Sequence, residues 1–245
     1  LASRGNLANA HQAAGRTQDA IAILEPLLED LSRAVGAEHP DALLARGNLA
    51  NVYQAAGRGD EAVAIFEPLV ADLDRIRGPE HPDTLVIRGD LANAHQAAGR
   101  LDEAIALLEP LVADRDRIHG PGHPSTLNAR NSLANAYQDA GRPGEAIAIF
   151  EPLVADLERT FGSDHPNTLG SRNNLASTYQ DAGRIDDAIA IYEPLVADLE
   201  RVLGAEHANT LGARNNLANA YQAAGRPEDA DRLRGSGAEG DSGWV

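Results

Sequence analysis

The tetrapeptide Asn6-Leu7-Ala8-Asn9 returns unchanged as Asn48-Leu49-Ala50-Asn51, 42 residues further along the chain. Its leucine then recurs at the same interval to the end of the sequence, at Leu91, Leu133, Leu175 and Leu217. No insertion or deletion interrupts this spacing, so the 245 residues hold nearly six copies of one repeat. Self-similarity at a fixed period of this size is typical of stacked repeat architectures.

One repeat, residues 82–123, has the pattern of two helices joined by a turn. Pro82 suits the first turn of a helix, because its φ is fixed and it has no N–H to lose. Gly99 suits the position just after a helix end. The acid at Asp102 favours a second helix start there, and this helix should end at Gly120. Such a hairpin has one apolar face, which only stacking against neighbours can bury, so the sequence predicts an all-α fold.

Several residues of this unit resemble the tetratricopeptide repeat (TPR), namely Leu91-Ala92, His95, Gly99, Ala104 and Leu108. The 42-residue period and the Gly-x-x-His-Pro links resemble in particular the repeats of kinesin light chain and of bacterial signalling proteins. The resemblance implies a right-handed α-solenoid of about six helix-turn-helix units, binding a peptide or protein in a concave groove lined by the first helices.

The repeat spacing also gives expected domain boundaries. One solenoid is expected over residues 1–234, with repeats near 1–39, 40–81, 82–123, 124–165, 166–207 and 208–234. The glycine-rich residues 235–245 are expected to form a flexible C-terminal tail. Because the chain opens at Leu1 inside the repeat pattern, we interpret it as the C-terminal part of a longer protein.

Composition excludes several function classes. The net charge is −16, which argues against nucleic acid and anionic membranes as partners. No apolar run approaches the ~18 residues needed to cross a bilayer. The chain has no cysteine, and all 21 basic residues are arginine, so thiol and lysine chemistry are absent. No catalytic triad order, phosphate loop or zinc-protease motif occurs, and we expect no enzyme activity, catalytic residue or cofactor.

Histidine recurs in the links between repeats, at His39, His81, His123, His165 and His207. Histidine beside an acid could bind a metal ion. Equivalent residues of stacked helices, however, lie about 8–10 Å apart, which is too far to share one ion easily. We therefore interpret these histidines as helix caps or packing residues and expect no metal site.

Amide side chains dominate the face of the first helix opposite its packed face. The candidate ligand-binding residues are Asn51, Asn93, Asn128, Asn131, Asn135, Gln138, Asn173, Asn174, Ser177, Gln180, Asn215, Asn216, Asn219 and Gln222. An amide is both a donor and an acceptor, so a row of amides can hold an extended peptide by its backbone. Alternatively, asparagine merely covers a wet surface, but it is a mediocre helix former, which favours binding.

The six repeats are not equivalent along this face. Asn131, Asn173 and Asn215 stand where the first three repeats have glycine, and Asp139 and Asp181 add acid nearby. The sequence therefore predicts that the main ligand contacts lie between residues 128 and 222. It also predicts a partner segment that is neutral to basic.

Two departures from the usual repeat pattern carry structural predictions. An arginine occupies an early first-helix position that is usually apolar, at Arg4, Arg46, Arg88, Arg130, Arg172 and Arg214. A half-buried arginine needs a carboxylate partner, and acids border the apolar stripe of the second helix at Asp72, Asp114, Asp156 and Asp198. We predict a ladder of internal ion pairs between the two sets.

The second departure is a proline inside each second helix, at Pro26, Pro68, Pro110, Pro152 and Pro194. The helical wheel places these prolines on the solvent face. Because an interior proline removes a backbone hydrogen bond, we predict a kink at each one.

Together with these observations, the resemblance implies a protein–protein interaction scaffold, cytoplasmic and part of a larger regulatory protein. The lysine-free, arginine-rich composition suggests a bacterial source. Two alternatives stay open: a structural scaffold that self-assembles through its edges, and a sensor domain for a small ligand. Leu7 has no preceding repeat to pack against, so end-to-end self-association of this chain is also expected.

Overall fold

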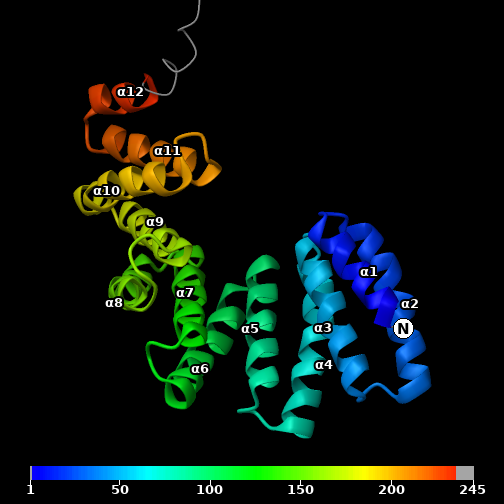
Figure 1. Cartoon of the computed structure of the whole chain (residues 1–245). Helices are drawn as coiled ribbons and strands as arrows, with labels where there is room; N and C mark the ends of the chain where they lie inside the picture. Colours follow the sequence, from blue (N-terminus) through cyan, green and yellow to red (C-terminus); the bar gives the residue numbers. More distant parts are fainter. Residues whose placement is uncertain (1, 236–245) are drawn as a thin grey trace, which may run out of the picture. The chain divides into compact units, whose positions relative to one another are not determined.

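The computed structural model describes residues 2–235, and within them it contains twelve α-helices and no strand (Figure 1). The helices are α1 (Ala2–Ala13), α2 (Thr17–Val35), α3 (Pro40–Ala55), α4 (Gly59–Arg77), α5 (Pro82–Ala97), α6 (Leu101–His119), α7 (Pro124–Asp139), α8 (Pro143–Phe161), α9 (Pro166–Asp181), α10 (Ile185–Leu203), α11 (Ala208–Ala223) and α12 (Pro227–Gly235). Residues 236–245, most of the expected tail, lie outside the described residues.

The helices form two compact blocks, divided between His119 and Gly120. The N-terminal block holds α1–α6 and the C-terminal block holds α7–α12. Within each block every helix packs against the next one along the chain, and neighbouring first helices, such as α7 and α9, also touch. The predicted all-α fold of stacked helix hairpins is therefore confirmed. None of the described helices is long and apolar enough to cross a membrane.

Histidine and glycine set the ends of the helices. The ring Nδ1 of His39 accepts a hydrogen bond from the backbone N–H of Asp41 at 3.2 Å, which makes it the N-cap of α3. The other four link histidines do the same for α5, α7, α9 and α11. The predicted capping role is therefore confirmed. Gly99 follows the C-cap of α5 with φ of +74°, a conformation that L-residues rarely adopt.

The core alternates small and large side chains. Ala62 of α4 and Ala50 of α3 are fully buried, as are their equivalents in the other repeats for which burial is described. These alanines let the two helices of a hairpin approach closely. The large residue at the centre of each full-length second helix, such as Phe66 or Tyr192, is equally buried. Packing of this kind fills each hairpin interior and fixes which first-helix face remains exposed.

The predicted arginine–aspartate ladder is present. The ion pairs include Arg46–Asp72 at 2.5 Å, Arg130–Asp156 at 3.1 Å and Arg172–Asp198 at 2.8 Å. Two of the arginines, Arg88 and Arg214, have a main partner other than the predicted aspartate. Arg88 lies 2.9 Å from Asp74 and 3.8 Å from the expected Asp114. Arg214 instead pairs with Glu200 of the preceding repeat at 2.7 Å.

Five second helices contain an interior proline, and each of them continues through it. All five proline rings are exposed, as the helical wheel predicts. An exposed position lets water satisfy the carbonyl that loses its partner, which explains why the helix does not end there. The expected kink stays a prediction.

Candidate binding surface of the first helices

The candidate amide residues all lie on first helices, and every one is at least partly exposed. In α7, for example, Leu133 and Tyr137 are buried, whereas Asn131, Asn135 and Gln138 are not. The helix thus buries its apolar stripe and leaves the amides accessible. Asn128, Asn215, Asn219 and Gln222 are the most exposed of the set.

Amide groups of neighbouring first helices bond to one another in the C-terminal block. Asn174 on α9 donates through Nδ2 to Oδ1 of Asn135 on α7 at 3.0 Å. Asn216 on α11 donates in the same way to Asn173 on α9 at 3.3 Å. Lateral amide bonds therefore join α7 to α9 through Asn174, and α9 to α11 through Asn173. Sequence analysis did not foresee these lateral bonds, since they depend on the distance between hairpins.

Two further lateral contacts extend this row. Ser171 Oγ donates to Asn131 Oδ1 at 3.0 Å. Gln138 Nε2 donates to Asp181 Oδ2 at 2.7 Å and to Ser177 Oγ at 3.2 Å. Asp181, which sequence analysis singled out only as a source of negative charge, therefore takes part in the same network.

Of the glycines that stand in the N-terminal block where Asn131 and Asn173 stand in the C-terminal block, one has a close neighbour on the next first helix. A Cβ at Gly47 would lie 3.4 Å from Cδ1 of Ile87, tighter than most real contacts. In the C-terminal block the residues equivalent to Ile87 are Ser171 and Ala213, which are smaller. Alanine also stands at this position next to Gly5 and Gly89, as Ala45 and Ala129, so the contact with Ile87 accounts for Gly47 alone.

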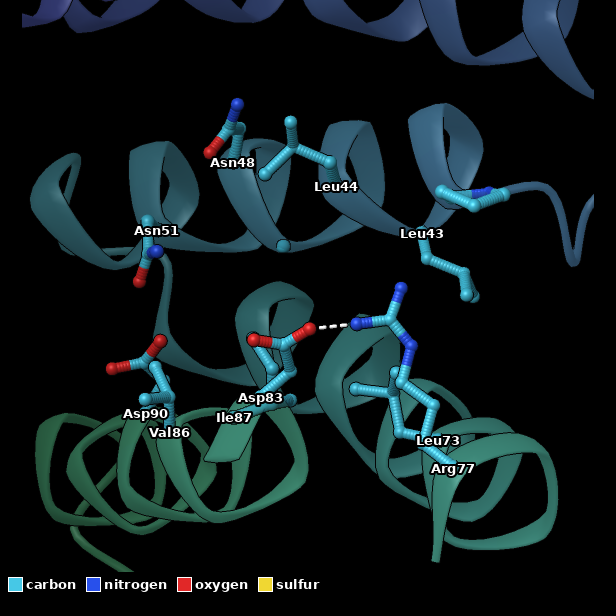
Figure 2. A pocket seen from close by; sticks show the side chains of 12 residues that line it. Leu43, Leu44, Asn48, Asn51, Leu73, Arg77, Asp83, Val86, Ile87 and Asp90 are labelled. Atoms are coloured by element: carbon cyan, nitrogen blue, oxygen red, sulfur yellow. Dashed lines mark ion pairs between the residues drawn. The ribbon is translucent and has the colours of Figure 1, made fainter. Parts of the chain in front are cut away.

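An acid interrupts the amide row in the N-terminal block. Asp90 on α5 stands where the neighbouring repeat has Asn48, and it faces Asn51 of α3 (Figure 2). Burial raises the pKa of the Asp90 carboxyl, against the opposing effects of a hydrogen bond from Asn51 and the charge of Arg115. Burial also lowers the pKa of Arg115, which donates to the backbone oxygen of Leu85 at 2.9 Å.

Sequence analysis missed Asp90 and Arg115, although the repeat register contains the signal. Arg115 stands where the equivalent positions hold Leu73, Leu157 and Leu199. A charged residue that replaces a recurrent core leucine calls for a nearby opposite charge. The sequence therefore indicates Asp90 and Arg115 as soon as the six repeats are aligned with one another.

A pocket recurs at one register position, between a first helix, its second helix and the next first helix. In the N-terminal block it lies between α3, α4 and α5 and has a volume of about 300 Å³. Leu43, Leu44 and Val86 line it, and an ion pair between Arg77 and Asp83 crosses one end (Figure 2).

The same register gives two pockets in the C-terminal block. The one between α7, α8 and α9 measures about 200 Å³, and the one between α9, α10 and α11 about 560 Å³. In the larger pocket Gly170 and Gly212 stand where the N-terminal pocket has Leu44 and Val86. Sequence analysis named the amides at its rim, Asn173, Asn174 and Asn216, but did not foresee the pocket itself.

The described residues hold no group of three or more histidine, aspartate or glutamate side chains arranged to bind a metal ion.

Comparison with known proteins identifies the repeat. A family model described as tetratricopeptide repeat matches residues 1–67, 41–113, 88–155, 133–193 and 168–233. No curated protein matches the chain.

Solved structures give the same result. The nearly identical TPR-like repeats of a Podosopora anserina chain assigned to kinesin light chain are 34% identical, with a TM-score of 0.74, over 82% of this chain and 95% of that one. BtubC (BKLC) from P. vanneervenii is 19% identical, with a TM-score of 0.72, over 94% and 95%. A Rap protein complexed with competence and sporulation factor is 12% identical, with a TM-score of 0.64, over 95% and 72%. At the two lower identities the likeness concerns the fold alone.

Proposed function

Because this chain belongs to the tetratricopeptide repeat family, we propose that it is a protein-interaction module whose amide row binds an extended segment of a partner protein. The observation that carries the proposal is the two lateral amide bonds, one joining α7 to α9 and one joining α9 to α11. Asn135, Asn174, Asn173 and Asn216 come from three successive first helices and lie within hydrogen-bond distance in pairs. Neighbouring packed helices are about 8–10 Å apart, which corresponds to about three residues of extended peptide.

The chemistry of amides suits recognition of a peptide backbone. Each amide carries two N–H donors and an oxygen with two lone pairs, so one lateral bond leaves capacity for a ligand. Lateral bonds also hold each amide in place before the ligand arrives, which reduces the entropy lost on binding. Backbone bonding of this kind would tolerate many side chains.

Charge restricts which segments are suitable. Asp139 and Asp181 are exposed at the ends of α7 and α9, and the whole chain carries a net charge of −16. An acidic segment would be repelled during approach, whereas a neutral or basic one would not. We therefore propose a partner segment that is neutral to basic.

We further propose a regulatory role in the cytoplasm of a bacterium. The arginine-only basic composition supports a bacterial source. The resemblance of the 42-residue repeats to those of bacterial signalling proteins supports a regulatory role.

A random peptide library displayed on phage and selected on the purified chain tests the binding function. Selected peptides should bind with roughly micromolar Kd. The double variant Asn135→Ala/Asn174→Ala should weaken binding about tenfold, because two hydrogen-bonding groups are lost.

The chain supplies a matched control for this experiment. Asn51 is the equivalent of Asn135 two repeats earlier, so Asn51→Ala makes the same chemical change in the N-terminal block. Because Asn51, although among the candidate residues, lies outside residues 128–222, where we predict the main ligand contacts, we expect Asn51→Ala to leave binding unchanged. A library that yields no binders, or binders lost with Asn51→Ala and retained with the double variant, would contradict the proposal.

One observation favours a second candidate, end-to-end self-association of the chain that comprises residues 1–245. Leu7 is 51% exposed, whereas its equivalents in the later repeats, Leu49 and Leu175 among them, are at most 6% exposed. If this apolar end mediates association, light scattering should show a mass that rises with protein concentration, and Leu7→Ser should abolish the rise. A constant monomeric mass rules this candidate out.

A further inference from the structure

We propose that the pocket between α9, α10 and α11 is a specificity pocket that accepts one large apolar side chain of the bound partner segment. This inference rests on the proposed function and names a feature that the partner must carry. The amide row would hold the backbone of the segment, and the pocket would select among its side chains.

The first support is the comparison of equivalent pockets within one chain. In the N-terminal block, Leu44 and Val86 occupy the two positions that are Gly170 and Gly212 in the C-terminal block. Ile87 is likewise replaced by Ala213. These exchanges accompany the increase in volume from about 300 Å³ to about 560 Å³. The larger pocket thus lacks the side chains that fill its counterpart.

The second support is that neither glycine has a structural reason. Gly170 and Gly212 lie within helices, and neither has positive φ. A Cβ built on either would meet no atom within 4 Å. A glycine inside a helix is less stable than an alanine, because it loses more backbone freedom on folding. Two such positions, both beside the same pocket, point to space that is kept open for a ligand.

The lining decides what kind of group fits. The hydrocarbon walls come from Leu169, Leu199, Val202 and Leu203. Leu203 replaces Arg77 of the N-terminal pocket, so the ion pair drawn in Figure 2 has no equivalent here. An apolar group gains most from such a wall, since its transfer out of water is favourable. The pocket therefore suits a side chain of the size of leucine, phenylalanine or tryptophan.

The rim decides what may flank that side chain. Asn173, Asn174 and Asn216 line the same pocket and belong to the amide row. Asp164 also lines it, and Arg201 pairs with this acid at 2.6 Å. Amides beside an apolar cavity match a peptide backbone on either side of a buried side chain. Together with the negative charge of the chain, this favours uncharged or basic neighbours over acidic ones.

The test uses peptides selected on the chain and variants that refill the pocket. The double variant Gly170→Leu/Gly212→Val copies Leu44 and Val86 of the N-terminal block, and the open space around each glycine leaves room for the new side chains. Each peptide is also made with its large apolar residues changed to alanine one at a time. Binding is measured by fluorescence anisotropy, and folding by circular dichroism.

We expect one alanine change per peptide to weaken binding at least tenfold. The refilled variant should fold, bind the parent peptide at least tenfold more weakly, and bind the alanine peptide no more weakly than the parent protein does. The converse variant Leu44→Gly/Val86→Gly, which opens the N-terminal pocket, should leave the parent affinity unchanged.

Other outcomes overturn the proposal in distinguishable ways. If peptides bind and Asn135→Ala/Asn174→Ala weakens them, while the refilled variant binds equally well, the specificity pocket is refuted and the proposed function stands. If no peptide binds, both fail. If free tryptophan or leucine binds as tightly as the peptides do, the pocket is a small-ligand site instead.

Discussion

At His95 the chain departs from the tyrosine that most repeats have at this position. The imidazole is only 5% exposed, and burial lowers its pKa, although Glu67 lies 3.9 Å away and opposes the shift. The tyrosines at equivalent positions instead donate to a glutamate of the preceding second helix, as Tyr221 does to Glu193 at 2.8 Å. Histidine is thus held neutral where tyrosine would form a hydrogen bond.

This difference predicts a pH-dependent stability. The pKa of histidine in the unfolded chain is about 6.5, and the folded pKa of His95 is lower. Below about pH 6.5 the unfolded state therefore binds more protons, so the free energy of unfolding falls as the pH falls. His95→Tyr should remove this loss and restore a hydrogen bond to Glu67, worth about 0.5–1.5 kcal/mol.

Urea unfolding of both proteins at pH 5 and pH 8 measures the effect. The gain from His95→Tyr should be larger at pH 5. Tyr53→His, the reverse change at the equivalent position of the preceding repeat, should introduce the same pH dependence. An equal gain at both pH values would show that His95 does not contribute through its proton.

At the scale of helices, the arginine–aspartate ladder joins first helices to second helices. Arg172 and Arg4 occupy the same register and pair with Asp198 and Asp30, both at 2.8 Å. Their exposure differs, since the side chain of Arg172 is 12% exposed and that of Arg4 is 50% exposed. Arg172 also lowers the pKa of the Asp198 carboxyl by its hydrogen bond.

Because Arg172 is more buried than Arg4, its removal should lower the free energy of unfolding by more. Arg172→Ala removes the main partner of a half-buried carboxylate, which keeps Arg201 at 3.0 Å, and should cost about 1.5–3 kcal/mol of unfolding free energy. Arg4→Ala breaks a solvated pair and should cost less than about 1 kcal/mol. Urea unfolding in low and high salt checks both values, because salt screens mainly the exposed pair. Equal costs would mean that the ladder contributes no more inside the stack than at its end.

The regularity of the elements explains how much the sequence alone could predict. A constant 42-residue register places Arg130 beside Asp156 as it places Arg172 beside Asp198, although Arg88 and Arg214 have other main partners. Features within one hairpin, such as the histidine caps, could therefore be inferred once and extended to every copy. The sequence also placed Asn135 and Asn174 on the exposed side of their helices.

Features between hairpins were harder to predict, because they depend on the distance between neighbouring first helices. The bond from Asn174 to Asn135 and the contact of Asn51 with Asp90 belong to this class. The open pocket at Gly170 and Gly212 could be predicted in part. Its volume needs coordinates, but the loss of side chains at one register position is visible in the sequence.

At the scale of the whole chain, the pattern of contacts predicts which helices lose stability when one core residue is replaced. Each helix packs against its neighbours along the chain within its block, so stability is approximately a sum of local terms. Leu169 on α9 is 4% exposed, and Leu169→Ala should cost about 2–5 kcal/mol locally.

Amide hydrogen exchange followed by mass spectrometry can locate that cost. In Leu169→Ala, protection should fall most in α8–α11, whereas α1–α4 should exchange as in the parent chain, because none of their packing partners has changed. A fall in protection of similar size in every helix would show that the chain unfolds as one cooperative body. In that case a ligand bound at α9 would stabilise α2 of the other block as much as α10. Local coupling would instead confine its effect to the helices around the amide row.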